Sequence, residues 1–376
     1  MAKALVNGRV LIGRKFATGH AVIVEDGRIR EVTAGDIPDD ADILDLHGRI
    51  LVPGFVDVQV NGGGDRLFND DPSVETIAAI GRTHRQFGTT GFLPTLISDD
   101  AAKIAAAIDA ARMAIVAGVP GVLGVHIEGP FLNPAKKGIH DPTKLRPISN
   151  SDIELLSRPT GGKTVVTLAP EAVPADAIRR LAAADVVVSA GHTQATADQV
   201  FEALRNGLRG FTHLFNAMSQ LGSREPGVVG AALYDQNSWC GIIADGHHVD
   251  PRVLKIALRA TPLRRFMLVS DAMPSVGGRK TFMLHGEKIS AAAGKCVNAH
   301  GTLAGSDLDM ASAVRNAVTM LGVDLAEAVM MASANPAAFL GLDHELGRIA
   351  PGYRANFVLL DDRLQVVESW IDGVRA

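Results

Sequence analysis

The chain has 376 residues, of which 47% are apolar and 21% charged, and its formal net charge is −4. This length and balance are typical of a globular protein with one large and one small domain. A weakly negative chain lacks the basic surface that nucleic acids and anionic membranes bind, so we expect neither as a partner. No apolar run reaches the roughly 20 residues that span a bilayer. Two cysteines without metal-binding spacing predict a reduced protein in the cytoplasm.

Short strands joined by turn signals make up both ends of the chain. The runs ALVNGRVLIG, HAVIVEDGRIREV and ADILDLHGRIL are separated by Asn-Gly, Asp-Gly and Gly turns, and the last thirty or so residues contain three similar runs. We therefore expect a small β-sandwich domain formed from residues 1–52 and 346–376. These two segments would flank a central domain of residues 53–345.

The central segment alternates predicted strands with predicted helices. Eight strand candidates are enriched in apolar and β-branched residues: LVPGFVDV from Leu51, TGFLPTLI from Thr90, VLGVHIE from Val122, TVVTLAPE from Thr164, DVVVSAG from Asp185, GFTHLFN from Gly210, CGIIADG from Cys240 and RFMLVSDA from Arg265. The stretches between most of them have apolar residues three and four apart, as amphipathic helices do. Eight such alternations in about 250 residues predict an α/β fold of the TIM-barrel type. A doubly wound open sheet is the alternative, which spacing alone does not exclude.

Local signals place some of the element ends. Asp99 and Thr196 are expected to be helix N-caps. Within the irregular, glycine-rich segment 274–305, the run TFMLHGEKISAA predicts a β-hairpin, and a helix is expected from Asp307 to Leu321.

Four short runs place chemically active side chains at the ends of predicted strands. They are HIEGPF with Glu128, SAGHT with His192, THLFNAM with His213 and SDAM with Asp271. The carboxyl ends of barrel strands meet at one face, so these side chains should converge. A carboxylate and two imidazoles are typical of a catalytic zinc site, and Asp271 would be free to carry protons. Any one of them alone could be a packed histidine or a helix cap, but the four in register favour a metal-dependent hydrolase.

The same motifs resemble a known family when their order is considered. PGFVDVQVNG, HIEGPF, AGHT, HLFNAM, DGHHV, SDAM and GTLAGS occur in the order seen in the N-acetylglucosamine-6-phosphate deacetylase family of the amidohydrolase superfamily. The resemblance covers essentially the whole chain, and HIEGPF and HLFNAM are its most specific motifs. It implies hydrolysis of N-acetylglucosamine 6-phosphate to glucosamine 6-phosphate and acetate in amino-sugar catabolism, by a homodimer.

The resemblance also implies the roles of individual residues. Glu128, His192 and His213 match metal ligands, Asp271 matches the general base and acid, and His140 matches a residue that helps polarise the acetyl carbonyl. Other matches are substrate contacts, with Arg224 and His248 at the phosphate and Ile139, Asn216, Ala217, Asp245, Leu303, Ala304 and Gly305 elsewhere. Asn216 could instead cap a helix and Arg224 could be a surface charge, while Lys136 and Lys137 are expected to be solvated surface charges.

One departure from the wider superfamily bears on the metal count. Many members carry His-x-His on the first strand, where it binds a second metal, but here Gln59 and Asn61 occupy those positions. Neutral amides are poor zinc ligands beside imidazole and carboxylate, so we expect one divalent metal ion, Zn²⁺, per subunit. Two alternatives remain open: a cyclic amidase, dipeptidase or deaminase of the same superfamily, and a non-catalytic sugar-phosphate sensor. Arg224 and His248 favour a phosphorylated substrate over the first of these.

Overall fold

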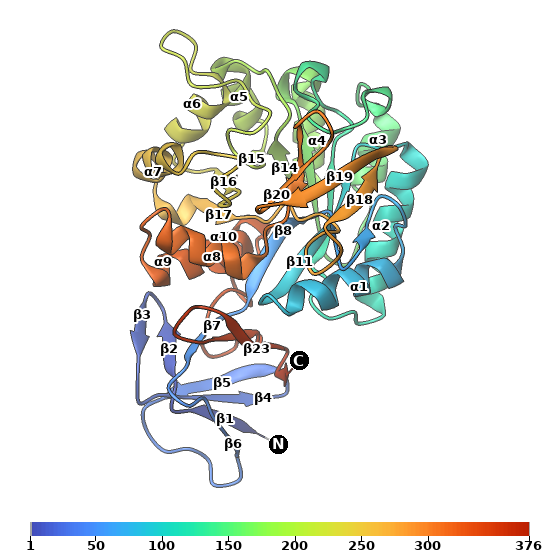
Figure 1. The fold of residues 1–376 in the computed structure, drawn as a ribbon. Helices are drawn as coiled ribbons and strands as arrows, with labels where there is room; N and C mark the ends of the chain where they lie inside the picture. Colours follow the sequence, from blue (N-terminus) through green and yellow to red (C-terminus); the bar gives the residue numbers. More distant parts are fainter. Residues whose placement is uncertain (1, 376) are drawn as a thin grey trace.

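A parallel sheet of eight strands forms the centre of the computed structural model, which describes residues 2–375 (Figure 1). In sheet order the strands are β8 (Phe55–Val60), β11 (Thr89–Ile97), β12 (Gly124–Glu128), β13 (Lys163–Leu168), β14 (Val187–Ala190), β15 (Leu208–Phe211), β16 (Trp239–Ile242) and β17 (Phe266–Leu268). The first strand meets the segment after the last one, since Val60 pairs in parallel with Ala272 and the backbone N–H of Asp271 lies 3.0 Å from the carbonyl oxygen of Gln59. The predicted TIM barrel is therefore confirmed, and the open sheet is wrong.

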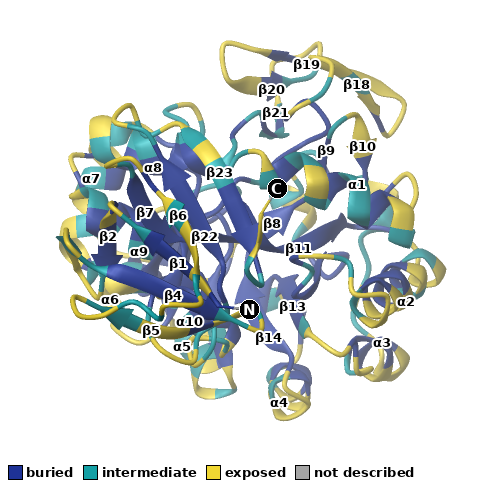
Figure 2. Cartoon of the chain, turned by 90° about the horizontal axis from the view of Figure 1, so that it is seen from below, coloured by how far each residue is buried: buried dark blue, intermediate teal, exposed yellow. Residues whose placement is uncertain are grey.

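Helices surround the barrel and bury their inner faces against it. They are α1 (Val74–Arg85), α2 (Ala101–Val116), α3 (Asn150–Leu156), α4 (Ala175–Ala183), α5 (Ala197–Arg205), α6 (Gly227–Tyr234), α7 (Pro251–Ala260), α8 (Met310–Thr319), α9 (Leu325–Ala332) and α10 (Ala334–Leu340). Short 3₁₀ turns lie between them: η1 (Pro134–Lys136), η2 (Pro142–Lys144), η3 (Pro170–Ala172) and η4 (Leu263–Arg265). Figure 2 shows the barrel strands buried and the outer helix surfaces exposed. Among the described residues, no helix combines the length and apolar character needed to cross a bilayer.

The helix caps agree with the sequence signals at one of two expected positions. Thr196 caps α5, where it accepts a hydrogen bond from the backbone of Gln199 in a capping box. The expectation for Asp99 is wrong by one residue, because Asp100 is the N-cap of α2. The carboxylate of Asp99 accepts a hydrogen bond from Asn69 and pairs with Lys103 at 3.1 Å, so it is occupied by tertiary contacts.

Both ends of the chain combine into a small β domain beside the barrel (Figure 1). One sheet has the order β5 (Arg28–Thr33), β4 (Ala21–Glu25), β1 (Lys3–Val6) and β6 (Asp42–Asp45). The other has the order β24 (Val374–Arg375), β23 (Val366–Ile371), β22 (Phe357–Leu360), β7 (Ile50–Pro53), β2 (Arg9–Ile12) and β3 (Lys15–Ala17). The second sheet joins the termini directly, because β22 pairs antiparallel with β7. Leu5, Val10, Phe357 and Trp370 belong to the separate apolar core of this domain.

The first predicted strand, from Leu51, divides between the two domains. Its start is part of β7 in the terminal sheet and its remainder is β8 of the barrel, so the expectation of a single barrel strand is wrong. Gly54 stands at the junction, where an added Cβ would lie 1.9 Å from the hydroxyl oxygen of Thr90. Only glycine lets the chain pass this close to the second barrel strand.

A separate antiparallel sheet covers part of the barrel mouth. It contains β18 (Thr281–Leu284), β19 (Glu287–Ala292), β20 (Lys295–Val297) and β21 (Leu303–Ser306), so the predicted hairpin is confirmed and extended by two strands. A small hairpin of β9 (Gly62–Gly63) and β10 (Arg66–Leu67) lies at the same end. Ile289 and Cys296 of the larger sheet pack with Ile97 and Met273 of the barrel, which seats the sheet over the strand ends.

Candidate active site

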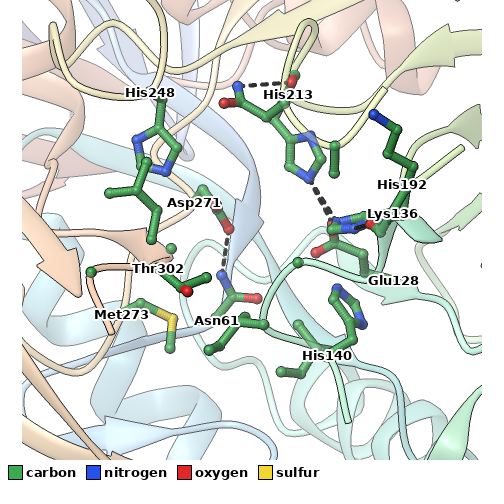
Figure 3. Close-up of a pocket in the computed structure, with 18 of the residues that line it drawn as sticks. Asn61, Glu128, Lys136, His140, His192, His213, His248, Asp271, Met273 and Thr302 are labelled. Atoms are coloured by element: carbon green, nitrogen blue, oxygen red, sulfur yellow. Dashed lines mark hydrogen bonds and ion pairs between the residues drawn. The ribbon is translucent and has the colours of Figure 1, made fainter. Parts of the chain in front are cut away.

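The strand ends enclose a pocket of about 470 Å³ beneath the β18–β21 sheet. The structure brings together there most of the residues predicted from the sequence: Glu128, Ile139, His140, His192, His213, Asn216, Ala217, His248, Asp271, Leu303 and Gly305. Figure 3 shows the imidazoles and carboxylates facing one another across this space.

Three side chains in the pocket form a compact set of potential metal ligands. His192 Nε2 lies 3.1 Å and His213 Nε2 3.0 Å from the same oxygen, Oε1 of Glu128, and the two nitrogens are 3.1 Å apart. Zinc–nitrogen and zinc–oxygen bonds of about 2.0–2.1 Å place tetrahedral ligand atoms roughly 3.3 Å apart. All three side chains are buried. The set therefore fits one divalent metal ion.

The tautomer of His192 suits metal ligation. Its Nδ1 lies 2.8 Å from the carbonyl oxygen of Lys136. A carbonyl can only accept, so Nδ1 carries the proton and Nε2 keeps a lone pair toward Glu128 and His213. A backbone carbonyl behind a histidine ligand is a common way to fix the ring for metal binding.

His140 also lies close enough to be considered as a ligand. Potential ligand atoms of Glu128, His140 and His192 all lie within 4.8 Å of one another. However, Nδ1 of His140 accepts from the backbone N–H of Ser98 at 3.3 Å and lies 2.7 Å from the Ser98 hydroxyl. Its proton is therefore on Nε2, which leaves no lone pair there for a metal. His213 is the better third ligand, and His140 is a hydrogen-bond donor.

The pKa shifts of the pocket residues differ in a way that suits their different roles, His140 as a neutral donor and Glu128 as an ionised ligand. Burial and the nearby His192 hold the pKa of His140 well below its ordinary value, so its ring is neutral. Burial alone would raise the pKa of Glu128, but the imidazoles of His192 and His213 against its carboxylate hold it well below its usual range. Burial opposes charge on His213, yet the adjacent carboxylate of Glu128 raises its pKa. A carboxylate that stays ionised in a buried site is suited to hold a cation.

Asp271 differs from Glu128 because its proton is more firmly held. Burial, and next the charge of Glu128, raise the pKa of Asp271 to about 6. Its Oδ1 accepts from Asn61 Nδ2 at 2.7 Å and from Gln59 Nε2 at 3.2 Å. Gln59 Nε2 also lies 3.1 Å from the other carboxylate, at Oε2 of Glu128. A carboxyl group that titrates near neutrality is suited to move a proton in either direction.

Unusual backbone conformations aim several of these side chains into the pocket. His192, His213 and Asp271 have φ values of 51°, 33° and 52°, in the left-handed region that few non-glycine residues adopt. Such conformations cost energy and persist where the surrounding structure enforces them, often at functional sites. Asn216 helps to hold one of them, because its Nδ2 donates to the carbonyl oxygen of His213 at 3.0 Å. Its predicted alternative role as a helix cap is not what the structure shows.

Three of the predicted substrate contacts lie outside the pocket wall. Asp245 lies behind His248, and its Oδ2 is 2.6 Å from His248 Nδ1. Because Asp245 occupies Nδ1, the Nε2 atom of His248 is the ring nitrogen that can contact a substrate in the pocket. Ala304 is buried in β21 between two lining residues. Arg224 is exposed on the segment between β15 and α6, and it does not line the pocket of its own chain.

Some lining residues were not predicted as contacts. Asn61, Ile97, Ala135, Lys136, Met273, Gly301 and Thr302 also line the pocket. Lys136 is half-buried at the pocket wall, so the charge that was expected on the surface lies beside the pocket (Figure 3). Its place in the KKGIH run, four residues before His140, was the available signal.

Comparisons with known proteins agree with this geometry. Residues 50–375 match the model of the Amidohydrolase family. An N-acetylgalactosamine-6-phosphate deacetylase of Shewanella sp. (strain ANA-3) is 44% identical, with 98% of this chain and 95% of that protein covered. An N-acetylglucosamine-6-phosphate deacetylase of Haemophilus influenzae is 33% identical, with 99% of each covered. The crystal structure of the N-acetylglucosamine-6-phosphate deacetylase from Pasteurella multocida superposes with a TM-score of 0.96 at 33% identity, with 100% of each chain covered. The chain thus belongs to the amidohydrolase family and, within it, to the group of N-acetylglucosamine- and N-acetylgalactosamine-6-phosphate deacetylases.

Proposed function

We propose that the protein hydrolyses the N-acetyl amide of N-acetylglucosamine 6-phosphate to glucosamine 6-phosphate and acetate, in amino-sugar catabolism. The observation that carries this proposal is the convergence of Glu128, His192 and His213 on one point, with Asp271 and His140 facing the same pocket. Family membership supports it, because relatives of this group are named for this reaction. The complete set of potential ligands and proton-transfer groups also disfavours the alternative of a non-catalytic sugar-phosphate sensor.

The number and identity of the metal ions are also part of this proposal. One Zn²⁺ ion per subunit, held by Glu128, His192 and His213, would polarise the acetyl carbonyl and acidify the attacking water when bound. Gln59 and Asn61 support a single ion, since both donate hydrogen bonds to carboxylates through their amide nitrogens. The atom that either amide could offer a metal is its carbonyl oxygen, a poorer zinc ligand than imidazole or carboxylate.

The remaining chemistry is assigned to two side chains. Neutral His140 donates a hydrogen bond from its Nε2–H to the acetyl carbonyl oxygen, where negative charge develops in the transition state. Asp271 accepts a proton from the attacking water as a carboxylate and then delivers it to the nitrogen of the leaving amine. Burial and the charge of Glu128 raise its pKa to about 6 in the absence of a cation, which suits a group that exchanges protons near neutral pH. Asn61 and Gln59 hold the carboxylate in place for both transfers.

The phosphate is assigned to His248 and Arg224. His248 is oriented by Asp245 and faces the pocket. Arg224 is exposed and does not line the pocket of its own chain, which favours a role in the site of a second subunit. We therefore propose a homodimer in which Arg224 reaches across the interface, and the cytoplasm stays the predicted location.

N-acetylgalactosamine 6-phosphate is a second candidate substrate. It differs from the first only in the configuration at C4, so the same chemistry would apply. One observation favours it: the relative named for this sugar is 44% identical to the chain, whereas the H. influenzae relative named for N-acetylglucosamine 6-phosphate is 33% identical.

A comparison of the rates on several substrates tests the proposal. Acetate release would be measured on both sugar phosphates, on unphosphorylated N-acetylglucosamine, and on a cyclic amide and a dipeptide. We expect kcat/KM for one N-acetylhexosamine 6-phosphate to exceed that for every other class by at least 10²-fold, about 2.7 kcal/mol. A preference for the galacto epimer would select the second candidate. Faster turnover of the dipeptide or cyclic amide would contradict the proposal.

A further inference from the structure

A second, much smaller cavity lies inside the barrel behind the ring of His213. About 10 Å³ of it can hold the centre of a water molecule, which is near the roughly 10–15 Å³ that one water requires. Apolar residues form much of its wall, and its polar lining residues are Gln59, His126, Ser189, Thr212 and His213. His213 lines both this cavity and the active-site pocket, so it lies between the two.

The rear nitrogen of His213 lacks a partner. Nδ1 is buried and has no hydrogen-bond partner among the described residues. Its Nε2 points at Glu128, where a lone pair is needed for ligation of a metal. Nδ1 must then carry the proton, so it is a buried hydrogen-bond donor that requires an acceptor. His192, the other imidazole of the set, has the Lys136 carbonyl in the equivalent role.

A chain of hydrogen bonds crosses the barrel beside this cavity and has a defined direction. His126 Nδ1 lies 3.0 Å from the carbonyl oxygen of Val58, to which it must donate. The ring is buried and both its partners are uncharged, so it is neutral and its Nε2 accepts. The donor to Nε2 is the hydroxyl of Thr167, at 2.8 Å.

The direction of this first bond determines the next two. Because Thr167 spends its proton on His126, it accepts from the hydroxyl of Thr212, 2.6 Å away. Thr212 in turn accepts from the hydroxyl of Ser189, 2.7 Å away. Ser189 has then used its only proton, and its oxygen keeps a free lone pair. The chain therefore ends in an acceptor at the wall of the cavity that His213 also lines.

We propose that one water molecule occupies this cavity, accepts from His213 Nδ1–H and donates to Ser189 Oγ. Ser189 is thus a positioning residue for the metal site, because it fixes the tautomer and the orientation of His213 through the water. The inference rests on the metal ligands of the proposed function, and it adds four residues outside the active-site pocket to their support: Ser189, Thr212, Thr167 and His126.

The first test is metal affinity in Ser189→Ala. The variant removes the acceptor at the end of the chain with minimal change in volume. We expect the dissociation constant for Zn²⁺, measured by chelator competition, to rise roughly 10–100-fold, as is usual when the hydrogen-bond partner of a ligand is lost. Ser238→Ala is the matched control, since Ser238 also has a buried hydroxyl but lies outside the chain and the cavity. It should bind Zn²⁺ as the unaltered protein does.

The second test reports on the histidine itself. In Co²⁺-loaded protein, each ligating imidazole gives a hyperfine-shifted N–H proton signal, and we expect two such signals. Ser189→Ala should broaden or abolish the signal of His213, whose proton would exchange faster, and leave that of His192 unchanged. A merely structural effect of the substitution would not select one imidazole.

Three outcomes would overturn the inference. They are an empty cavity in a high-resolution crystal structure of the metal-loaded protein, an unchanged dissociation constant with both N–H signals retained in Ser189→Ala, and equal losses in Ser189→Ala and Ser238→Ala. These readouts do not depend on turnover, so a failed deacetylase assay is distinguishable from a failed inference. A protein that bound no divalent metal would overturn both.

Discussion

Asn61 and Asp271 are hydrogen-bonded at 2.7 Å across the seam where the barrel closes. Asn61 follows the first barrel strand and Asp271 follows the last, so the bond joins the two ends of the parallel sheet at the mouth of the pocket. Asn61 occupies a position where many amidohydrolases are expected to have a metal-binding histidine. Here it instead tethers the carboxylate assigned to proton transfer.

This bond predicts a pH effect. The hydrogen bond from Asn61 lowers the pKa of Asp271 against the opposing effects of burial and of Glu128, which raise it to about 6. Asp271 must be a carboxylate to accept a proton, so kcat/KM should fall as pH decreases through its pKa. A bound cation favours the carboxylate, so the acid limb should lie at or below about pH 6. In Asn61→Leu the limb should move to higher pH.

The measurement is the pH profile of kcat/KM for the unaltered protein, Asn61→Leu and Asn237→Ala. Asn237 is exposed and outside the pocket, so its variant should keep the original profile. A limb that moves to lower pH in Asn61→Leu would show that Asn61 does not stabilise the carboxylate.

Asp271→Asn should abolish turnover without loss of the metal. An amide cannot accept the proton of the attacking water, and loss of a group that serves two proton transfers should reduce kcat by about 10³-fold or more. The side chain is close in size and can still face Asn61. Turnover and metal content would be measured on the same sample. Loss of the metal would mean that Asp271 is chiefly a ligand.

His140→Asn separates a hydrogen-bond donor from a ligand. Loss of one donor to the developing oxyanion should reduce kcat by roughly 10²–10³-fold and leave metal content unchanged. Ser98→Ala should have a smaller effect, because the backbone N–H of Ser98 still fixes the tautomer of His140. If His140→Asn releases the metal, then His140 rather than His213 completes the ligand set.

Arg224→Ala tests how the phosphate is recognised. We expect a loss of about 2 kcal/mol or more in kcat/KM on the sugar phosphate, the range for a charge-assisted hydrogen bond. The poor activity on unphosphorylated N-acetylglucosamine should hardly change. Equal losses on both sugars would show that Arg224 supports the fold.

A mixing experiment tests whether Arg224 acts across an interface. When Arg224→Ala and Asp271→Asn subunits are mixed, a heterodimer contains one site with an intact Asp271 and an intact Arg224 from the other chain. Activity should therefore reappear in the mixture. No recovery in verified heterodimers would place Arg224 in its own subunit.

The convergence of Glu128, His192 and His213 could be predicted because barrel geometry converts sequence register into position. Glu128 is the last residue of β12, while His192 and His213 each come two residues after the end of their strand. Parallel strands bring these ends to one face whatever the loops do. The alternation of eight strands with amphipathic helices favoured a barrel, but its closure through the pairing of Val60 with Ala272 appears only in the structure.

Details set by tertiary contacts could not be predicted. The run from Leu51 reads as one apolar strand, although Pro53 and Gly54 within it are a turn signal, and the chain passes from one domain to the other at this pair. The sequence does not distinguish Asp99 from Asp100 as the helix N-cap. In the structure, Asp99 contacts Lys103 and Asn69, and Asp100 is the N-cap. The sequence also does not show that the loop carrying Lys136 brings this residue to the pocket wall.

The most direct test of the account is the rate of acetate release from the two N-acetylhexosamine 6-phosphates, with metal content measured on the same protein sample. The account predicts turnover of a phosphorylated sugar, no comparable turnover of unphosphorylated N-acetylglucosamine, and close to one equivalent of divalent metal per chain. Turnover should disappear when the metal is chelated and return when it is restored. Metal-replete protein that releases no acetate from either sugar phosphate would contradict the account.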